Sequence, residues 1–286
     1  MRTRHTIAEV RELIAAWKHA GETIAFVPTM GNLHDGHLSL FEAARATCPG
    51  KDIKLVASVF VNPLQFGKGE DFDTYPRTLE QDSEQLEQLG VDLLFAPSVN
   101  EMYPNGQALQ TRVIPPDIGE ILEGECRPGF FTGVATVVNK LFNMVLPDVA
   151  VFGEKDFQQL MVIRRMVADL GMPVRIVSAS TVREADGLAM SSRNAYLSAD
   201  QRPIAAKLNL CLDHLISELK QGTDCQYAVM HAMREIENMG FMVDYVVIRR
   251  RQDLGVPVKG DRELVALVAA KLGTTRLIDN KSFDLS

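Results

Sequence analysis

The chain has 286 residues, of which 46% are hydrophobic and 23% charged, and 30 Lys and Arg against 37 Asp and Glu give it a formal net charge of −7. This length is sufficient for a sizeable core and for one or two domains. The acidic balance argues against broad binding to nucleic acid or to an anionic membrane, and no apolar run approaches the ~20 residues that span a bilayer. We therefore expect neither nucleic acid nor a membrane as a partner.

The four cysteines, Cys48, Cys126, Cys211 and Cys225, are widely scattered along the chain. No C-x-x-C pair occurs among them, so the pattern favours neither a disulfide framework nor a zinc site. Such thiols fit a reducing compartment. The N-terminal residues lead into an amphipathic segment rather than an apolar signal-peptide core. These features predict a cytoplasmic protein.

Helix-like and strand-like segments alternate over the first 180 residues. Thr6 is a predicted N-cap of the first helix, and Gly21 ends that helix. The predicted helices cover residues 7–20, 37–47, 78–89, 132–146 and 156–170, and the predicted strands cover residues 23–27, 53–61, 92–96, 149–152 and 174–177. Repeated strand–helix units of this kind predict an α/β fold, a Rossmann-like doubly wound parallel sheet with helices on both faces.

The pattern changes after residue 181. A polar loop at residues 183–193 precedes predicted helices at 199–220 and 224–240, and predicted strands at 242–249, 264–270 and 276–278. This arrangement predicts a smaller α+β C-terminal domain. We place the boundary between residues 181 and 182, which gives domains of residues 1–181 and 182–286.

The most informative segment follows the strand predicted at residues 23–27 and reads Pro28-Thr29-Met30-Gly31-Asn32-Leu33-His34-Asp35-Gly36-His37. Backbone N–H groups at a helix start attract phosphate, and ligands of parallel sheets bind beyond the carboxyl ends of strands. His34 and His37 would lie at this turn and could donate hydrogen bonds to phosphate oxygens. An H-x-G-H element in this context is typical of nucleotidyl-transferring α/β folds. The alternative is a tight turn with two surface histidines.

A second strand end carries two side-chain amides. Asn62 and Gln65 follow the strand predicted at residues 53–61, where their side chains could face a pocket. The alternative is a polar turn in which Pro63 ends the strand.

A third strand end reads Phe152-Gly153-Glu154-Lys155-Asp156-Phe157-Gln158-Gln159. Lys155 is a compact, mobile charge suited to a polyphosphate. Gln159 follows it by four residues and would share its helical face. The alternatives are a surface turn and, for Asp156, a helix cap.

The polar loop contains Asp186-Gly187-Leu188-Ala189-Met190-Ser191-Ser192-Arg193-Asn194. A mobile loop with two hydroxyls and an arginine can fold over phosphates and give charge-assisted hydrogen bonds. It is similar to a degenerate form of the lysine-serine loop of class I aminoacyl-tRNA synthetases. A solvated linker is the alternative.

Taken in order, these segments resemble the pantothenate synthetase (pantoate–β-alanine ligase) family over about residues 5–280. The motifs are P-T-M-G-N-L-H-x-G-H, F-V-N-P-x-Q-F, Y-P-R-T, F-G-E-K-D-x-Q-Q-L and D-G-L-A-M-S-S-R-N. The resemblance implies a two-step ATP-dependent reaction. Pantoate attacks the α-phosphorus of ATP to give pantoyl adenylate and pyrophosphate, and β-alanine then attacks the acyl carbon to give pantothenate and AMP.

The resemblance also implies roles for individual residues. It places ATP on Met30, Gly31, Asn32, Leu33, His34, Asp35, Gly36 and His37, on Gly153, Glu154, Lys155 and Asp156, and on Val182, Met190, Ser191, Ser192 and Arg193. It places pantoate between Gln65 and Gln159, beside Asn62, against apolar groups that include Pro28, Met30, Val137, Val138 and Phe152, and β-alanine at Gln65. The expected catalytic set is His37, with an acid-like role, and His34, Lys155, Ser191, Ser192 and Arg193.

The chemistry of these side chains agrees with that assignment. Neutral amides can orient the pantoate carboxylate without quenching its nucleophilicity, while donors aimed at the phosphates stabilise the charge that builds there. Mg²⁺ is expected to bridge phosphate oxygens with few protein ligands, and Asp82 is a candidate ligand. The resemblance further implies a homodimer, and a second domain that closes over the ATP site.

One position departs from the family pattern. The family reads R-P-G-H-F where this chain has Arg127-Pro128-Gly129-Phe130-Phe131. A phenyl ring at Phe130 therefore replaces an imidazole, and we expect a modest effect on affinity or rate.

Other functions remain as alternatives from the sequence. Another adenylyl-transferring enzyme of the same fold would differ in its acceptor. An aminoacyl-tRNA synthetase is disfavoured because the chain is short and acidic. A non-catalytic nucleotide-binding regulator would be expected to have a broken phosphate site, yet both motif histidines, Lys155 and Arg193 are present.

Overall fold

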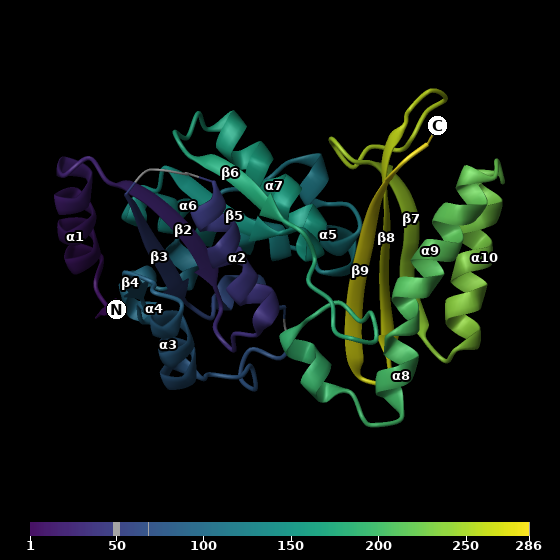
Figure 1. Cartoon of the computed structure of the whole chain (residues 1–286), viewed down its shortest axis with the longest axis horizontal. Helices are drawn as coiled ribbons and strands as arrows, with labels where there is room; N and C mark the ends of the chain where they lie inside the picture. Colours follow the sequence, from purple (N-terminus) through teal and green to yellow (C-terminus); the bar gives the residue numbers. More distant parts are fainter. Residues whose placement is uncertain (48–51, 68, 286) are drawn as a thin grey trace. The chain divides into compact units, whose positions relative to one another are not determined.

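The computed structural model describes residues 1–47, 52–67 and 69–285, which leaves Cys48 outside the described residues. The chain divides into two compact units (Figure 1). The first unit comprises Met1–Glu154 and Val162–Ser180, and the second comprises Lys155–Met161 and Thr181–Ser286. The segment Lys155–Met161 groups with the second unit although the first surrounds it in sequence. No helix within the described residues is long and apolar enough to cross a membrane.

The first unit is built on a six-stranded sheet in which every pairing is parallel. The strand order is β1-β4-β3-β2-β5-β6. The strands are β1 (Arg2–Arg4), β2 (Thr23–Thr29), β3 (Ile53–Val59), β4 (Leu93–Phe95), β5 (Val149–Gly153) and β6 (Arg175–Ala179). The predicted α/β fold with a parallel sheet is confirmed.

The strand order places a switch point beside β2. From β2 the chain builds β3 and β4 on one side, and then returns to build β5 and β6 on the other. In open parallel sheets, ligands bind in the crevice outside the carboxyl ends of the strands at such a point. The segments after β2 and β5, which carry the predicted nucleotide motifs, therefore lie where the topology favours a ligand.

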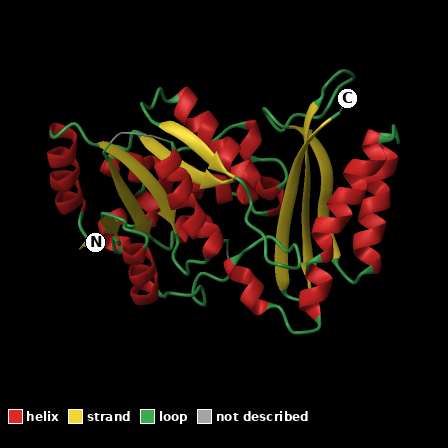
Figure 2. Ribbon diagram, viewed as in Figure 1, coloured by secondary structure: helices red, strands yellow, loops and turns green. Residues whose placement is uncertain are grey.

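Helices cover both faces of this sheet (Figure 2). Alternate residues of a strand point to opposite faces. Ala25 and Val27 pack with α2, whereas Phe26 meets Phe142 of α6 edge-on, with ring centroids 6.4 Å apart. The unit contains α1 (Ile7–His19), α2 (Asp35–Ala46), α3 (Leu79–Gln88), α4 (Val99–Met102), α5 (Glu123–Cys126), α6 (Phe130–Val145), most of α7 (Phe157–Asp169), and the 3₁₀ turns η1 (Pro63–Gln65), η2 (Gln107–Leu109) and η3 (Asp117–Gly119). A further 3₁₀ turn, η4 (Glu154–Asp156), links β5 to α7.

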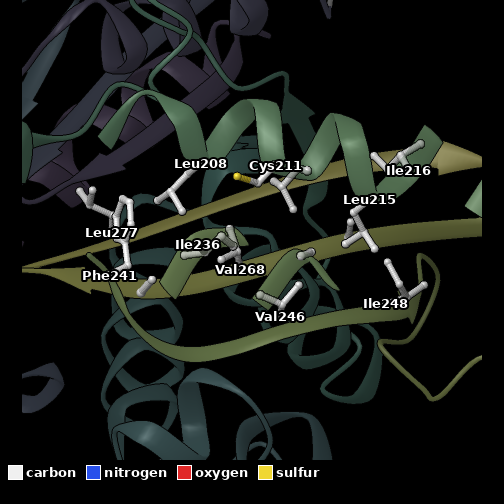
Figure 3. Close-up of a cluster of buried hydrophobic side chains, with 14 of the residues drawn as sticks. Leu208, Cys211, Leu215, Ile216, Ile236, Phe241, Val246, Ile248, Val268 and Leu277 are labelled. Atoms are coloured by element: carbon white, nitrogen blue, oxygen red, sulfur yellow. The ribbon is translucent and has the colours of Figure 1, made fainter. Parts of the chain in front are cut away.

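The second unit packs two helices on a small antiparallel sheet of order β7-β8-β9. Its elements are η5 (Ser192–Tyr196), α8 (Gln201–Ala205), α9 (Lys207–Lys220), α10 (Cys225–Asn238), β7 (Met242–Arg250), β8 (Glu263–Leu272) and β9 (Thr275–Asp284). Figure 3 shows side chains from α9, α10 and the strands meeting in its core, among them Leu208, Leu215 and Val268. Each leucine buried in this way contributes about 1.5–3 kcal/mol relative to its exposed state. Leu277 and Phe283 of β9 belong to this core, which holds the strand in place.

Several elements differ from the sequence-based expectations. β9 spans Thr275–Asp284 rather than residues 276–278, and the short edge strand β1 was not expected. The helix predicted at residues 199–220 is recorded as α8 and α9. Ala206 between them keeps helical dihedral angles, φ −61° and ψ −24°, so the backbone continues in helical geometry through the break.

Candidate active site

The turn after β2 presents a helix N-terminus at the switch point. Gly31 and Asn32 have positive φ angles of 83° and 51°, and α2 then begins at Asp35 with His34 as its N-cap. The helix starts two residues earlier than predicted. Gly31 is required here, because a Cβ atom would lie 2.9 Å from Asp82 Oδ2 and 3.0 Å from Val59 Cγ1.

Asp82 holds this turn in shape. Its side chain is 2% exposed, and its carboxylate accepts hydrogen bonds from the backbone N–H groups of Asn32 at 3.0 Å and Leu33 at 2.8 Å. The Thr78 hydroxyl lies 3.2 Å from the same carboxylate. These hydrogen bonds show that Asp82 positions the turn, and its role as a Mg²⁺ ligand stays a prediction. The partners are about 50 positions away in sequence, so local patterns gave no signal for this role.

His34 and His37 are brought together at the start of α2. Their ring centroids lie 4.0 Å apart, and the backbone N–H of His34 donates to Nδ1 of His37 at 3.4 Å. When Nδ1 accepts, a neutral His37 carries its proton on Nε2. Nε2 is then the ring atom that can donate a hydrogen bond to an anion.

The predicted pantoate residues Met30, Asn62 and Gln65 meet in one hydrogen-bonded network. Gln65 Nε2 donates to Met30 Sδ at 3.2 Å, and Asn62 Nδ2 donates to Gln65 Oε1 at 3.1 Å. Asn62 is 1% exposed, and its Oδ1 accepts from the Tyr103 hydroxyl at 2.7 Å. Burial raises the pKa of Tyr103, so this hydroxyl stays protonated as the donor. Asn62 thus orients Gln65, and its direct contact with a substrate stays a prediction.

A close approach of two helical elements fixes this network. Asn62 Nδ2 also donates to the Gly133 carbonyl of α6 at 3.2 Å. A Cβ at Gly133 would lie 2.3 Å from Leu64 O and 2.8 Å from Gln65 N, so only glycine allows η1 to pack so closely on α6. Sequence reasoning missed Gly133 and Tyr103, because neither belongs to a recognisable motif.

The apolar residues expected around the dimethyl carbon are buried or half-buried. Val137 and Val138 of α6 and Phe152 of β5 are 5–6% exposed, and Pro28 at the end of β2 is half-buried. Phe152 packs edge-on against Phe142, with ring centroids 6.3 Å apart. Their joint contact with a ligand stays a prediction.

The boundary between the two units falls within the predicted ATP and pantoate residues at the end of β5 and the start of α7. Gly153 and Glu154 belong to the first unit, whereas Lys155, Asp156 and Gln159 belong to the second. Lys155 Nζ lies 3.8 Å from Asp156 Oδ1, and the Lys155 side chain is 20% exposed. Gln159 is half-buried in the first turn of α7.

The loop at residues 183–193 folds back on itself within the second unit. Arg183 and Ala189 form a β-bridge, and the Met190 N–H donates to the Val182 carbonyl at 3.0 Å. Ser191 caps η5, since its hydroxyl accepts from the Arg193 N–H at 3.3 Å. Ser192 and Arg193 are half-buried in η5, so the three predicted phosphate residues of the loop lie together at the start of this 3₁₀ turn.

Comparison with known proteins decides the family. The model of the pantoate–β-alanine ligase family matches residues 2–282. The pantothenate synthetases of Shewanella halifaxensis and Thioalkalivibrio sulfidiphilus are 50% and 54% identical to this chain over 286 residues, covering 100% of this chain and 100% and 99% of theirs. The chain belongs to the pantoate–β-alanine ligase family.

Solved structures of ligase-family proteins agree with the fold. Pantothenate synthetase from Thermus thermophilus has a TM-score of 0.90 at 47% identity, covering 98% of this chain and 99% of its own. Pantoate–β-alanine ligase from Francisella tularensis, complexed with beta-gamma ATP and β-alanine, has a TM-score of 0.82 at 34% identity, covering 98% of this chain and 97% of its own. The family expected from the sequence motifs is therefore confirmed.

Phe130, at which this chain departs from the ligase-family motif, packs its ring against an arginine. The Arg127 guanidinium stacks over the Phe130 ring, with Cζ 3.8 Å from the ring centroid. Arg127 also forms a bidentate pair with Glu70, in which Nε lies 2.8 Å from Oε1, and donates to the Gln65 carbonyl at 3.2 Å. The motif around Phe130 therefore braces the backbone of Gln65.

Proposed function

We propose that this chain catalyses the ATP-dependent condensation of pantoate with β-alanine to pantothenate, through a pantoyl adenylate, with release of pyrophosphate and AMP. The observation that carries this proposal is the hydrogen-bonded Met30–Asn62–Gln65 network beside the switch point in a pantoate–β-alanine ligase family member. Gln65, a neutral amide rather than a cation, contacts Met30 in the turn that leads into α2, and helix N-termini favour anions. A carboxylate held by such an amide keeps its nucleophilicity.

In the first step, a pantoate carboxylate oxygen forms a bond to the α-phosphorus of ATP, and the bond from that phosphorus to the bridging oxygen of pyrophosphate breaks. In the second, the β-alanine amine bonds to the acyl carbon, AMP leaves with the bonding electrons, and the amine loses a proton. We assign Gln65, Gln159 and Asn62 to pantoate, with Pro28, Met30, Val137, Val138 and Phe152 around its dimethyl carbon, and Gln65 also to β-alanine.

Negative charge grows on the departing pyrophosphate in the first step, and donors aimed at it stabilise the transition state. One such donor is typically worth about 3 kcal/mol. His37 suits this role because its Nδ1 is engaged and its Nε2 can donate. We assign catalysis to His34, His37, Lys155, Ser191, Ser192 and Arg193, and further ATP contacts to Met30, Gly31, Asn32, Leu33, Asp35, Gly36, Gly153, Glu154, Asp156, Val182 and Met190.

We propose that Mg²⁺ enters with the nucleotide. Among the described residues, no three His, Cys, Asp or Glu side chains form a group that could hold a metal ion. Mg²⁺ commonly keeps several waters and binds substrate phosphates through few protein ligands. Bound to the phosphates, the ion would neutralise part of their charge.

We also propose that the chain is a homodimer, as the family resemblance implies, and that it is cytoplasmic, as the scattered cysteines favour. Sedimentation equilibrium of the full chain measures the mass directly. A mass of twice 31.7 kDa supports the dimer, and a mass of 31.7 kDa contradicts it.

Product analysis tests the proposed function. With ATP, Mg²⁺, pantoate and β-alanine, we expect free AMP and pantothenate in equal amounts. A product that retains AMP covalently would indicate the alternative, an adenylyl transferase with another acceptor. ATP binding without turnover would indicate a nucleotide-binding protein.

A further inference from the structure

Two adjacent polar residues are buried in the middle of β9. Asp279 is 4% and Asn280 is 7% exposed, and they pair with Val268 and Leu267 of β8. Buried polar side chains in a strand are expected to have specific partners, since an unpaired one costs free energy. The partners here lead to the two segments that carry the proposed phosphate residues.

Asp279 anchors the base of the loop at residues 183–193. Its carboxylate forms a bidentate pair with the Arg183 guanidinium. Nη1 donates to Oδ2 at 2.7 Å, and Nη2 donates to Oδ1 at 2.9 Å. Bidentate pairs of this kind fix geometry as well as charge. Arg183 Nη1 also donates to the Gly187 carbonyl at 3.1 Å, and Arg183 forms the β-bridge with Ala189. Asp279 thereby fixes the loop that leads into Ser191–Arg193.

Asn280 holds the backbone of Lys155. Its Nδ2 donates to the Lys155 carbonyl at 2.8 Å, across 125 positions of sequence. Because a carbonyl oxygen can only accept, this contact sets the orientation of the Asn280 amide. The Asn280 N–H in turn donates to Asp279 Oδ1 at 2.7 Å. One dipeptide therefore links the loop base to the Lys155 backbone.

We infer that Asp279 and Asn280 are positioning residues for the reaction, which hold Lys155 and the Ser191–Arg193 segment in a fixed mutual arrangement. This inference rests on the proposed function, which assigns both groups to the phosphates. Preorganised donors act only when their separation matches the ligand, and a misplacement of about 1 Å can cost about 100-fold in rate. Asn280 acts on catalysis through Lys155, without touching the substrate.

The test measures steady-state pyrophosphate release, with ATP, Mg²⁺, pantoate and β-alanine present, by the full chain carrying Asn280→Ala. We expect about a tenfold fall in kcat, with the KM for pantoate within twofold of the parent. Asn280→Asp preserves the side-chain size but lacks the amide donor when ionised, so we expect at least the same loss from it. Asn238→Ala, at an exposed site at the end of α10, is the matched control and should leave kcat unchanged.

A double-mutant cycle separates positioning from a merely structural effect. If Asn280 acts through Lys155, Asn280→Ala should lower the residual rate less than threefold in a Lys155→Ala background, measured with stoichiometric enzyme. The inference is overturned if Asn280→Ala lowers the rate of the parent chain less than threefold. It is also overturned if Asn280→Ala lowers the rate by the same factor in the parent and in the Lys155→Ala background. If the parent itself releases no pyrophosphate, the proposed function fails instead.

Discussion

The Arg127 guanidinium lies 3.8 Å from the centroid of the Phe130 ring, at the position where the sequence departs from the family motif. A cation over an aromatic face gains about 0.5–1 kcal/mol at exposed sites and about 2 kcal/mol when desolvated. The same guanidinium donates to the Gln65 carbonyl and pairs with Glu70. The phenyl ring thus supports the residue proposed to hold pantoate.

Replacement of Phe130 tests that support. We expect Phe130→His to change kcat/KM for pantoate by less than about tenfold, which corresponds to ~1.4 kcal/mol. Phe130→Ala removes the ring and should raise the KM for pantoate about two- to fivefold, with little effect on ATP. Steady-state kinetics with each substrate varied in turn measures both. A gain above tenfold in Phe130→His would mean that the imidazole contributes substantially in this scaffold.

Lys155→Ala should nearly abolish adenylate formation while the fold stays intact. The reason is the loss of a charge proposed to face the phosphates, from a side chain that is partly exposed and therefore contributes little to the core. Pyrophosphate release measures the chemistry, and circular dichroism with thermal melting measures the fold. Lys207→Ala, in the same unit, serves as the charge-matched control. Pyrophosphate release at the parent rate would exclude the phosphate role.

Gln159→Leu should weaken pantoate binding far more than ATP binding. The substitution removes the amide at nearly constant volume, so a proposed hydrogen bond is lost without a large cavity. Calorimetric titration with each ligand separately gives the two dissociation constants. Equal losses for pantoate and ATP would contradict the assignment of Gln159.

Asp82→Ala should both destabilise the fold and weaken ATP binding. It leaves the buried N–H of Leu33 and the N–H of Asn32 without their carboxylate, at a cost of about 1–3 kcal/mol for each unsatisfied donor. Urea unfolding and ATP titration are the measurements. Glu84→Ala, on the same helix, is the control. A variant with parent stability, or one with unchanged ATP affinity, would contradict the role of Asp82 in shaping the turn.

Local signals in the sequence predicted much of the fold. Thr6 was expected to cap α1, and its hydroxyl accepts from Glu9 N while the Glu9 carboxylate receives the Thr6 N–H. The apolar runs of β2, β3 and β5 identified buried parallel strands, because burial on both faces leaves no polar alternation. The residue pattern alone was therefore sufficient to place the motif segments at strand ends.

Long-range contacts set the limit of prediction. Most of β9 was not predicted, because Asp279 and Asn280 interrupt its apolar pattern. Their partners, Arg183 and Lys155, lie 96 and 125 positions away in the sequence. Asp82 was expected only as a candidate metal ligand, and its hydrogen bonds to the backbone N–H groups of a distant turn had no local signal. The requirement for glycine at position 133 arises only from the packing of η1 on α6. In each case the requirement comes from tertiary packing rather than from neighbouring residues.

The most direct test of the proposed reaction is pyrophosphate release on rapid mixing of the full chain with ATP, Mg²⁺ and pantoate. Without β-alanine, we predict a burst stoichiometric with enzyme, because the adenylate forms once and stays bound. Addition of β-alanine should convert the burst into steady formation of AMP and pantothenate. ATP binding with no burst would contradict a pantoyl adenylate intermediate and, with it, the proposed ligase reaction.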